Sequence, residues 1–233
     1  DFSQFVRRGA MTLDPFPLYL TVQVSLCATV LVVLLGTPLA WTLARKQFWG
    51  KHLVDALVMQ PMVIPPTVLG YYLLVLFGRN SWLGHFLEHY LGVQLVFNWK
   101  GAVIAATVAS LPLFVKPART AIESVDVAFE DVARLLGRSE WSVIRTVTLP
   151  LAWRGLVAGT VMAFTRAMGE FGTTLMVMGN IPGKLQTVSI AIYDASQSVD
   201  DSDRMRANLL VAIVTIFSVT VLWCVSRLTR GKI

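Results

Sequence analysis

Three residues with metal-binding and acid–base side chains lie close together in the sequence. His85, Glu88 and His89 have the H-x-x-E-H spacing of one class of zinc hydrolases, in which the histidines hold the metal and the carboxylate handles a proton. The pattern is short, and the only other histidine in the chain is His52. We therefore expect no metal site and no catalytic residue, and interpret residues 85–89 as an amphipathic turn at a membrane surface. An intramembrane zinc hydrolase is the alternative from another functional class.

Two charged residues interrupt the apolar residues 155–182. Arg166 and Glu170 are four residues apart, so on a continuous helix they would face the same side and could pair. Because a charge in mid-membrane costs about 2.5–3.5 kcal/mol, both should face protein or water. The pair either locks helix packing or lines a translocation path, where Glu170 would be a gate, a counter-charge or a helix tie. If the pair lines a path, Gly169 and Gly172 would allow close approach of another helix, and Thr173 would offer a hydroxyl.

The composition indicates what must surround these residues. Of 233 residues, 55% are hydrophobic and 15% are charged, whereas soluble domains contain about 25% charged residues. An apolar surface of this size must lie in lipid. The segments long enough to span a bilayer are residues 18–44, 56–77, 101–115, 155–182 and 207–226. The expected fold is all-α and polytopic, with five spans, or six if another helix lies in residues 1–17 or 81–97.

The chain is expected to form one membrane domain, residues 18–233, after an external tail, residues 1–17. In the second span, Pro65 and Pro66, followed by Gly70, either break the helix beside a path or kink it, because proline lacks a backbone N–H. In the fourth span, the GxxxG spacing of Gly155 and Gly159 favours close helix packing, of which a contact between two copies is one form.

Basic residues predict the orientation, because cytoplasmic loops carry an excess of lysine and arginine. The richer side, which we expect to be cytoplasmic, has Arg45, Lys46, Lys51, Lys116, Arg119, Arg134, Arg138, Arg145, Arg154, Arg227, Arg230 and Lys232. The other side has Arg7, Arg8, Arg79, Lys100, Lys184, Arg204 and Arg206. This places the N-terminus outside the cell membrane and the C-terminus in the cytoplasm. Since membrane orientation accounts for the net charge of +6, we expect no nucleic-acid partner.

The long segment on the basic side, residues 117–154, is predicted to form a short helix-turn-helix. Gly137 permits the turn, and Pro150 suits the first turn of the following helix. The segment resembles the signature of ABC importer permeases, which is Glu-Ala-Ala, three residues, Gly, nine residues and Ile-x-Leu-Pro. The matching residues, with the same spacing, are Asp131, Val132, Ala133, Gly137, Val147, Leu149 and Pro150. Asp131, Val132 and Val147 depart from the pattern but keep its charge or apolarity.

In that family this segment forms helices that sit in a groove of a cytoplasmic ATPase subunit, so we call residues 117–154 the coupling segment. Leu135 and Leu136 are the apolar anchors expected for that groove. The sequence contains no G-x-x-x-x-G-K-[ST] motif for binding phosphate. If transport is driven by ATP, the nucleotide and its Mg²⁺ must therefore bind the partner ATPase, and we expect this chain to bind no cofactor.

Further stretches resemble one branch of the family, the permeases for molybdate, sulfate and tungstate. They are residues 61–71, 99–103, 167–172, 179–183 and 190–193. The Asn-Ile-Pro-Gly loop at 180–183, followed by Ala-Ile-Tyr at 191–193, is most similar to the molybdate members. The resemblance implies an ATP-driven molybdate importer, with sulfate or tungstate as alternative cargoes. It also implies a homodimer around a central path, two ATPase subunits and an external oxyanion-binding protein.

Overall fold

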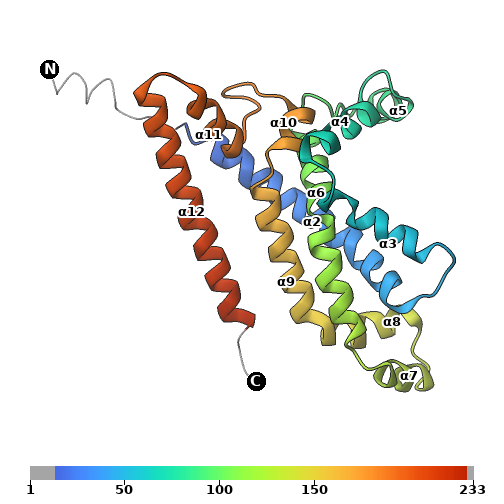
Figure 1. Ribbon diagram of the computed structural model, residues 1–233. Helices are drawn as coiled ribbons and strands as arrows, with labels where there is room; N and C mark the ends of the chain where they lie inside the picture. The colour runs from blue at the N-terminus through green and yellow to red at the C-terminus, as the bar shows by residue number, and fades with distance from the viewer. Residues whose placement is uncertain (1–13, 230–233) are drawn as a thin grey trace.

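The computed structural model describes residues 14–229, in which all regular structure is helical apart from an isolated β-bridge between Ile181 and Leu185. The elements in Figure 1 are α2 Phe16–Arg45, α3 Lys51–Met59, η1 Gln60–Met62, α4 Pro66–Phe77, α5 Trp82–Leu91, α6 Trp99–Glu123, α7 Val127–Leu135, α8 Glu140–Val143, η2 Ile144–Thr148, α9 Leu149–Met168, α10 Gly172–Met178, α11 Val188–Gln197 and α12 Asp201–Thr229. η2 is a π-helix, and η1 is a 3-10 helix. The predicted all-α class is confirmed.

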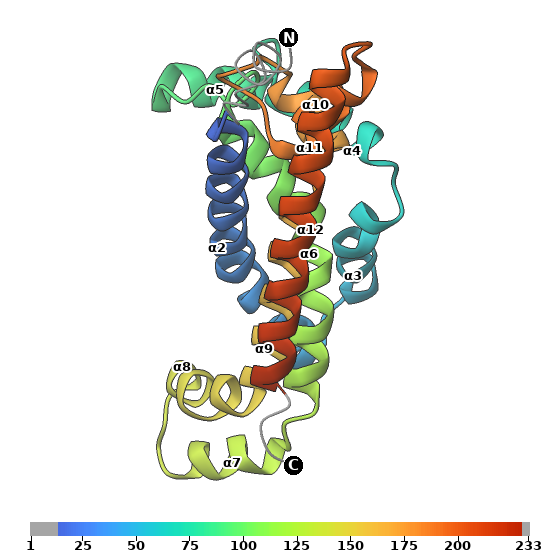
Figure 2. The ribbon, with the colours of Figure 1, turned by 90° about the vertical axis from the view of Figure 1, so that its left-hand side faces the viewer.

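Helix α6 is the centre of the bundle, with α2 and α9 packed against it (Figures 1 and 2). The most apolar part of α6 is 67% buried, whereas that of α12 is only 11% buried. Small residues allow the helices to approach closely. A Cβ atom added at Gly36 of α2 would lie 2.6 Å from the ring of Phe114 on α6. The interior of the bundle therefore depends on backbone proximity as much as on large side chains.

The GxxxG pair on α9 packs within one copy of the chain. A Cβ atom at Gly155 would lie 2.2 Å from the Cβ atom of Ala121, and one at Gly159 would lie 2.9 Å from the carbonyl oxygen of Phe114. Both contacts are with α6, so the predicted close helix packing is confirmed and its partner is intramolecular.

Four helical stretches are long and apolar enough to span a membrane: Phe16–Arg45, Trp99–Glu123, Glu140–Met168 and Asp201–Val221. A fifth span is reached if the bent pair Lys51–Met62 and Pro66–Phe77 counts as one. Helix α6 is about 37 Å long at 1.5 Å per residue, well beyond the charge-free segment predicted for it. In residues 81–97 the structure has only α5, too short to span. The other candidate for a sixth helix is residues 1–17, most of which (residues 1–13) lie outside the described residues.

The second span is broken, as one of the two predicted alternatives required. The direction of the helix changes by 113° between its two halves. Pro65 has the extended ψ of 135° and precedes α4, which begins at Pro66. A residue before proline is disfavoured in the α-helical region, and proline tolerates the first helical position because its missing N–H is not needed there. A simple kink in one continuous helix is therefore wrong.

The fourth apolar segment is also broken, which corrects the prediction of one continuous span over residues 155–182. Helix α9 ends at Met168, and α10 begins at Gly172. Glu170 lies in the break, and its Oε1 accepts a hydrogen bond of 2.8 Å from the backbone N–H of Thr173. That carboxylate satisfies a backbone donor at the start of α10, which an uninterrupted helix would have bonded internally.

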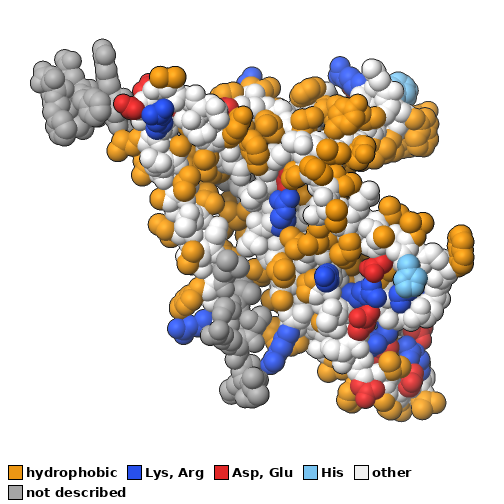
Figure 3. All heavy atoms as spheres, in the orientation of Figure 1, with side chains coloured by type: hydrophobic (Ala, Val, Ile, Leu, Met, Phe, Trp, Pro, Cys, Tyr) orange, Lys and Arg blue, Asp and Glu red, His pale blue; other side chains and the backbone are white. Residues whose placement is uncertain are grey.

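The two ends of the bundle differ in character. Helices α5, α10 and α11 lie at one end, and α7 and α8 lie at the other (Figures 1 and 2). In Figure 3, charged side chains gather at the end with α7 and α8, while hydrophobic side chains cover much of the remaining face. Helix α2 begins at the first end and finishes with Arg45 beside α7. The coupling segment therefore extends beyond the apolar bundle.

Candidate functional site

The coupling segment has the predicted helix-turn-helix form, and local side chains define its helices. Asp126 caps α7 by accepting a 2.9 Å hydrogen bond from the N–H of Ala128, and Ser139 caps α8. Gly137 has a φ of +81°, a left-handed conformation that glycine adopts without penalty. The turn predicted at this glycine is confirmed. The segment then enters the π-helical η2, a form often found at functional sites.

The apolar side chains of α7 face outwards. Leu135 is 87% exposed and Leu136 is 78% exposed, and Val132 is also exposed. Ala133 is buried. The buried apolar residue of α7 is therefore small and its exposed apolar residues are large. A helix that packs only within its own chain would bury its large apolar residues instead. The exposed leucines form an apolar surface available to a partner.

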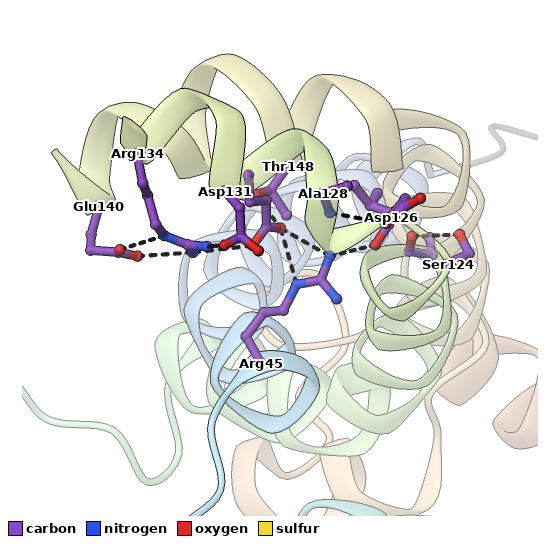
Figure 4. A network of polar contacts seen from close by, with 11 residues as sticks. Arg45, Ser124, Asp126, Ala128, Asp131, Arg134, Glu140 and Thr148 are labelled. Atoms are coloured by element: carbon purple, nitrogen blue, oxygen red, sulfur yellow. Dashed lines mark hydrogen bonds and ion pairs between the residues drawn. The ribbon is translucent and has the colours of Figure 1, made fainter. Parts of the chain in front are cut away.

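A buried carboxylate holds the coupling segment to the bundle. Glu130 is only 2% exposed, and its Oε1 accepts hydrogen bonds from the Nε of Arg45 at 3.0 Å and the Oγ1 of Thr148 at 2.9 Å. The Nη2 of Arg45 also donates to the carbonyl oxygen of Val125 at 2.7 Å. Figure 4 shows Arg45 reaching from α2 into this network, with Thr148 on the opposite side. The network joins α2, α7 and η2.

Arg134 forms the outer part of the same network (Figure 4). Its Nε donates to Glu140 at 2.7 Å and its Nη1 donates to Asp131 at 2.7 Å, while Nη2 lies 3.3 Å from Glu130. The hydrogen bond to Glu140, followed by that to Asp131, raises the pKa of Arg134 above its ordinary value, so the guanidinium stays charged. Arg134 therefore bridges the turn between α7 and α8, and Asp131, the first residue of the signature, holds the Arg134 side chain from within α7.

The remaining signature residues lie where the segment joins α9. Val147 and Leu149 are half-buried on either side of the buried Thr148, and Pro150 is exposed in the first turn of α9. Proline suits this position because the backbone N–H it lacks would have no partner within the helix. These residues fix the direction in which α9 leaves the segment.

The second predicted site lies at the α9–α10 break. Arg166 and Glu170 form an ion pair through Nη1 and Oε2, so the predicted pairing is confirmed. The expectation that both residues share a continuous helix is wrong, because Glu170 follows the end of α9. The side chain of Glu170 is 1% exposed and that of Arg166 is 31% exposed. The pair therefore has an accessible cation held by a buried anion.

The two broken spans meet at this site. The Oγ1 of Thr173 donates to the carbonyl oxygen of Pro66 at 3.2 Å. A Cβ atom at Gly172 would lie 2.9 Å from that of Pro66, and one at Gly70 would lie 2.7 Å from that of Met176. Thus the structure brings together Pro66, Gly70, Gly172 and Thr173, with Pro65 just before α4.

Gly169 does not take part in this helix contact. Its closest neighbour to an added Cβ atom is the carbonyl oxygen of Thr165, at 3.7 Å, in the preceding turn of its own helix. The expectation that Gly169 allows close approach of another helix is therefore wrong. Its position at the end of α9 is compatible with a residue other than glycine.

The histidine pattern lies on α5 without forming a metal cage. The rings of His85 and His89 stack with centroids 5.7 Å apart, while Glu88 accepts a 2.9 Å hydrogen bond from Arg79. Within residues 14–229, no group of three or more His, Cys, Asp or Glu side chains is arranged to hold a metal ion. The neighbouring row of α5 is aromatic, with Trp82 next to Phe86 and Phe86 next to Tyr90, and Tyr90 lies edge-on to His89. Such a row suits an amphipathic helix at a membrane interface.

Comparison with known proteins identifies the class of this arrangement. Residues 33–230 match the family described as the binding-protein-dependent transport system inner membrane component. The chain belongs to this family. It is therefore a multi-pass membrane permease that operates with a binding protein, and its relatives are named as transport permeases rather than enzymes.

Individual relatives cover nearly the whole permease. It is 40% identical to the molybdenum transport system permease protein ModB of Escherichia coli strain K12 over 91% of this chain and 93% of that protein. Identity to ModB of Haemophilus influenzae is also 40%, over 83% of this chain and 86% of that protein. A probable sulfate transport system permease protein, cysT of Chlorella vulgaris, is 33% identical over 85% of this chain and 73% of its own length.

A solved structure supports the same fold. The inward-facing MetNI methionine ABC transporter aligns with a TM-score of 0.71 at 16% identity, covering 95% of this permease and 96% of that chain. At this identity the similarity concerns the fold, which here is that of an ABC importer permease.

The sequence does not predict the buried ion pair at the centre of the network, nor the roles of Thr148, Arg134 and Glu140 around it. Glu130 immediately precedes the signature, and Arg45 contributes to the sequence analysis only through its charge, which predicts orientation. The spacing of Glu130 and Arg134 is compatible with a pair on one helix, which is a usable signal. Nothing local connects Glu130 with Arg45, because 85 residues separate them.

Proposed function

We propose that this permease is the membrane subunit of an ATP-driven molybdate importer, located in the cell membrane as a homodimer. Two cytoplasmic ATPase subunits bind the ATP and Mg²⁺, and an external protein delivers the oxyanion, so this chain binds no cofactor. The choice of cargo rests on 40% identity to two permeases named for molybdenum transport. Sulfate is the alternative, favoured by a 33% identical relative named for sulfate transport. Tungstate is a further alternative oxyanion.

The observation that carries the coupling role is the exposed apolar surface of α7. Leu135 and Leu136 extend from the end of the bundle on a segment whose turn and first helix cap are held by hydrogen bonds. Burying a leucine in a partner's groove contributes about 1.5–3 kcal/mol. Asp131, Val132, Ala133 and Gly137 shape this surface, and Val147, Leu149 and Pro150 join it to α9. ATP binding moves the ATPase pair, and the coupling segment passes that motion to the membrane helices.

The translocation path in this proposal runs along the site where α4 meets the α9–α10 break. Arg166 supplies a partly exposed positive charge that attracts an oxyanion, and Glu170 limits that attraction by pairing with it. Pro65, Pro66, Gly70, Gly172 and Thr173 shape the same region, and Gly169 lies in the break. The path lies between two copies, since within one copy only 22% of the span that includes α9 and 11% of the α12 span is buried. With α7 and α8 in the cytoplasm, the N-terminus lies outside and the C-terminus inside.

Uptake of labelled molybdate tests the cargo. Cells that lack their own importer would express the permease with its genomic ATPase and binding protein, with excess sulfate or tungstate as competitors. We expect uptake that persists in excess sulfate. Uptake suppressed by sulfate would assign the machine to sulfate, and suppression by tungstate alone would leave tungstate as the competing cargo.

The coupling role is tested by a Leu135→Asp, Leu136→Asp variant. Because both side chains are exposed, the chain should accumulate in the membrane, while the ATPase should fail to co-purify and uptake should stop. Val199→Asp is the matched control, since Val199 is 91% exposed in the connection between α11 and α12, at the opposite end from α7. Retention of the ATPase by the leucine variant would contradict the proposed docking surface.

The path is tested by Arg166→Gln and Arg166→Lys. The lysine variant keeps the positive charge and should retain part of the uptake, whereas the glutamine variant removes the charge and leaves Glu170 buried without it. Equal uptake by wild type and the glutamine variant, at equal amounts of assembled transporter, would exclude Arg166 from the path.

A further inference from the structure

Arg45 makes a connection that membrane orientation does not explain. It is the last residue of α2, where a basic side chain would ordinarily extend into water. Instead its side chain is only 13% exposed and turns towards α7, with Nη2 2.9 Å from the Oε1 of Glu130. The adjacent Lys46 is exposed and lies over the ring of Trp41 on its own helix. Two neighbouring basic residues thus differ in burial and in partner.

The contacts of Arg45 use the geometry of a guanidinium. Its Nε donates to the Glu130 carboxylate at 3.0 Å, and its Nη2 donates to the carbonyl oxygen of Val125 at 2.7 Å. Val125 lies between α6 and α7, so one side chain holds both the connection into α7 and α7 itself. A lysine ammonium lacks the planar fork that makes both contacts from one position.

The carboxylate extends the connection to the base of α9. Thr148, fully buried at the end of η2, donates to the same Oε1 atom of Glu130 at 2.9 Å. Movement of the α7–α8 turn can pass through the chain directly into η2 and α9. The network provides a second route, from α7 through Glu130 and Arg45 into α2, which packs against α6 and α9.

We propose that Arg45 and Glu130 are positioning residues that tie α2 to α7, so that the first membrane helix moves with the coupling segment. The inference rests on the proposed function, in which the ATPase docks on α7. Without the tie, the docked ATPase would still hydrolyse ATP and move α7, but α2 would follow incompletely. The expected defect is therefore in the number of oxyanions moved per ATP rather than in assembly.

The test uses the whole transporter reconstituted in liposomes with its ATPase and binding protein. Arg45→Met removes the fork while keeping an apolar stem, and Lys46→Met is the matched control. Molybdate uptake and ATP hydrolysis are measured in the same samples. Networks of this kind alter coupling by about 2- to 30-fold. We expect Arg45→Met to lower uptake per ATP within that range with the ATPase still bound, and Lys46→Met to match wild type.

Two more variants examine the connection itself. Arg45→Lys keeps the charge, and we expect it to restore only part of the molybdate uptake per ATP. It also replaces Arg45→Met as the test variant if Arg45→Met fails to accumulate in the membrane. Glu130→Gln removes the partner's charge, and combining it with Arg45→Met should add little to the loss from Arg45→Met alone, because both changes break one interaction. Additive losses would overturn the proposed pairing.

The outcomes separate this inference from the function on which it rests. Wild-type uptake per ATP in Arg45→Met would overturn the tie, and so would loss of ATPase binding, because the network would then only shape the docking surface. Failure of the proposed function would instead appear as continued ATPase binding by Leu135→Asp, Leu136→Asp, or as absence of oxyanion uptake by the wild type.

Discussion

Substituting Gly155 tests the packing that holds α9 against α6. In Gly155→Ala the new Cβ atom would begin 2.2 Å from the Cβ atom of Ala121 and 3.1 Å from the carbonyl oxygen of Pro117. Carbon atoms pack at about 3.5–4.0 Å. Since Cβ atoms and backbone oxygens are fixed to their helices, no side-chain rotation relieves the contact. The two helices must separate or tilt.

The expected loss of stability follows from two opposing effects. Overpacking a core costs about 1–3 kcal/mol, and a contact this short belongs in the upper part of that range. Alanine regains up to about 1 kcal/mol because glycine is a poor helix former. The net destabilisation expected for Gly155→Ala is about 1–2 kcal/mol, and Gly155→Val should lose more. Gly169→Ala is the control, because the new Cβ atom would lie at an ordinary contact distance, 3.7 Å, from its nearest neighbour, the carbonyl oxygen of Thr165.

Thermal unfolding of the purified permease provides the measurement. A loss of 1 kcal/mol lowers Tm by about 2–4 °C for a chain of this size, so Gly155→Ala should unfold roughly 2–8 °C below wild type. Gly169→Ala should unfold near the wild-type temperature. A wild-type Tm for Gly155→Ala would refute the packing argument. If that variant instead lost only its dimeric state, Gly155 would contact a second copy rather than α6.

Three other outcomes are expected. Glu130→Ala should lower the free energy of unfolding by about 3–5 kcal/mol, because it leaves the Arg45 guanidinium buried without its counter-charge. In the same thermal assay Glu130→Gln should lose less stability, because it can still form hydrogen bonds. Equal losses by the two variants would contradict the role of the hydrogen bonds. Gly137→Val should weaken ATPase co-purification because its φ of +81° is strained for a β-branched residue, whereas Gly137→Asn should retain it. A His85→Ala, His89→Ala variant should transport molybdate at the wild-type rate, and metal analysis of the wild type should find no stoichiometric zinc; activity lost on chelation would support the zinc alternative.

The sequence predicted the features that depend on local composition. Apolar segments located the membrane helices, because a residue in lipid must be apolar whatever its neighbours are. Gly137 predicted the turn between α7 and α8, since most other residues would be strained in the left-handed backbone conformation found there. The prolines before α4 predicted a break or a kink, and the angle of 113° required knowledge of how the halves pack.

The second broken span was missed because its signal is weak. No proline lies between Arg166 and Gly172, and Gly169 alone does not end a helix. The break is stabilised by Glu170, which bonds to the N–H of Thr173 and to Arg166. The break is also stabilised by Pro66, which contacts Gly172 and accepts a hydrogen bond from Thr173. Pro66 lies more than 100 residues away in the chain. A helical pattern contains no record of such a neighbour.

Hydropathy, turn-forming residues and motif spacing are local properties, so they were enough to predict an all-α membrane protein with a helix-turn-helix coupling segment. The contacts that these elements make with one another became visible only in the folded chain. The tertiary structure assigned Gly155 and Gly159 to α6, joined the two broken spans at Pro66 and Thr173, and buried Glu130 against Arg45. Each of these contacts joins residues distant in sequence, and their energies depend on burial and distance, which exist only once the helices have packed.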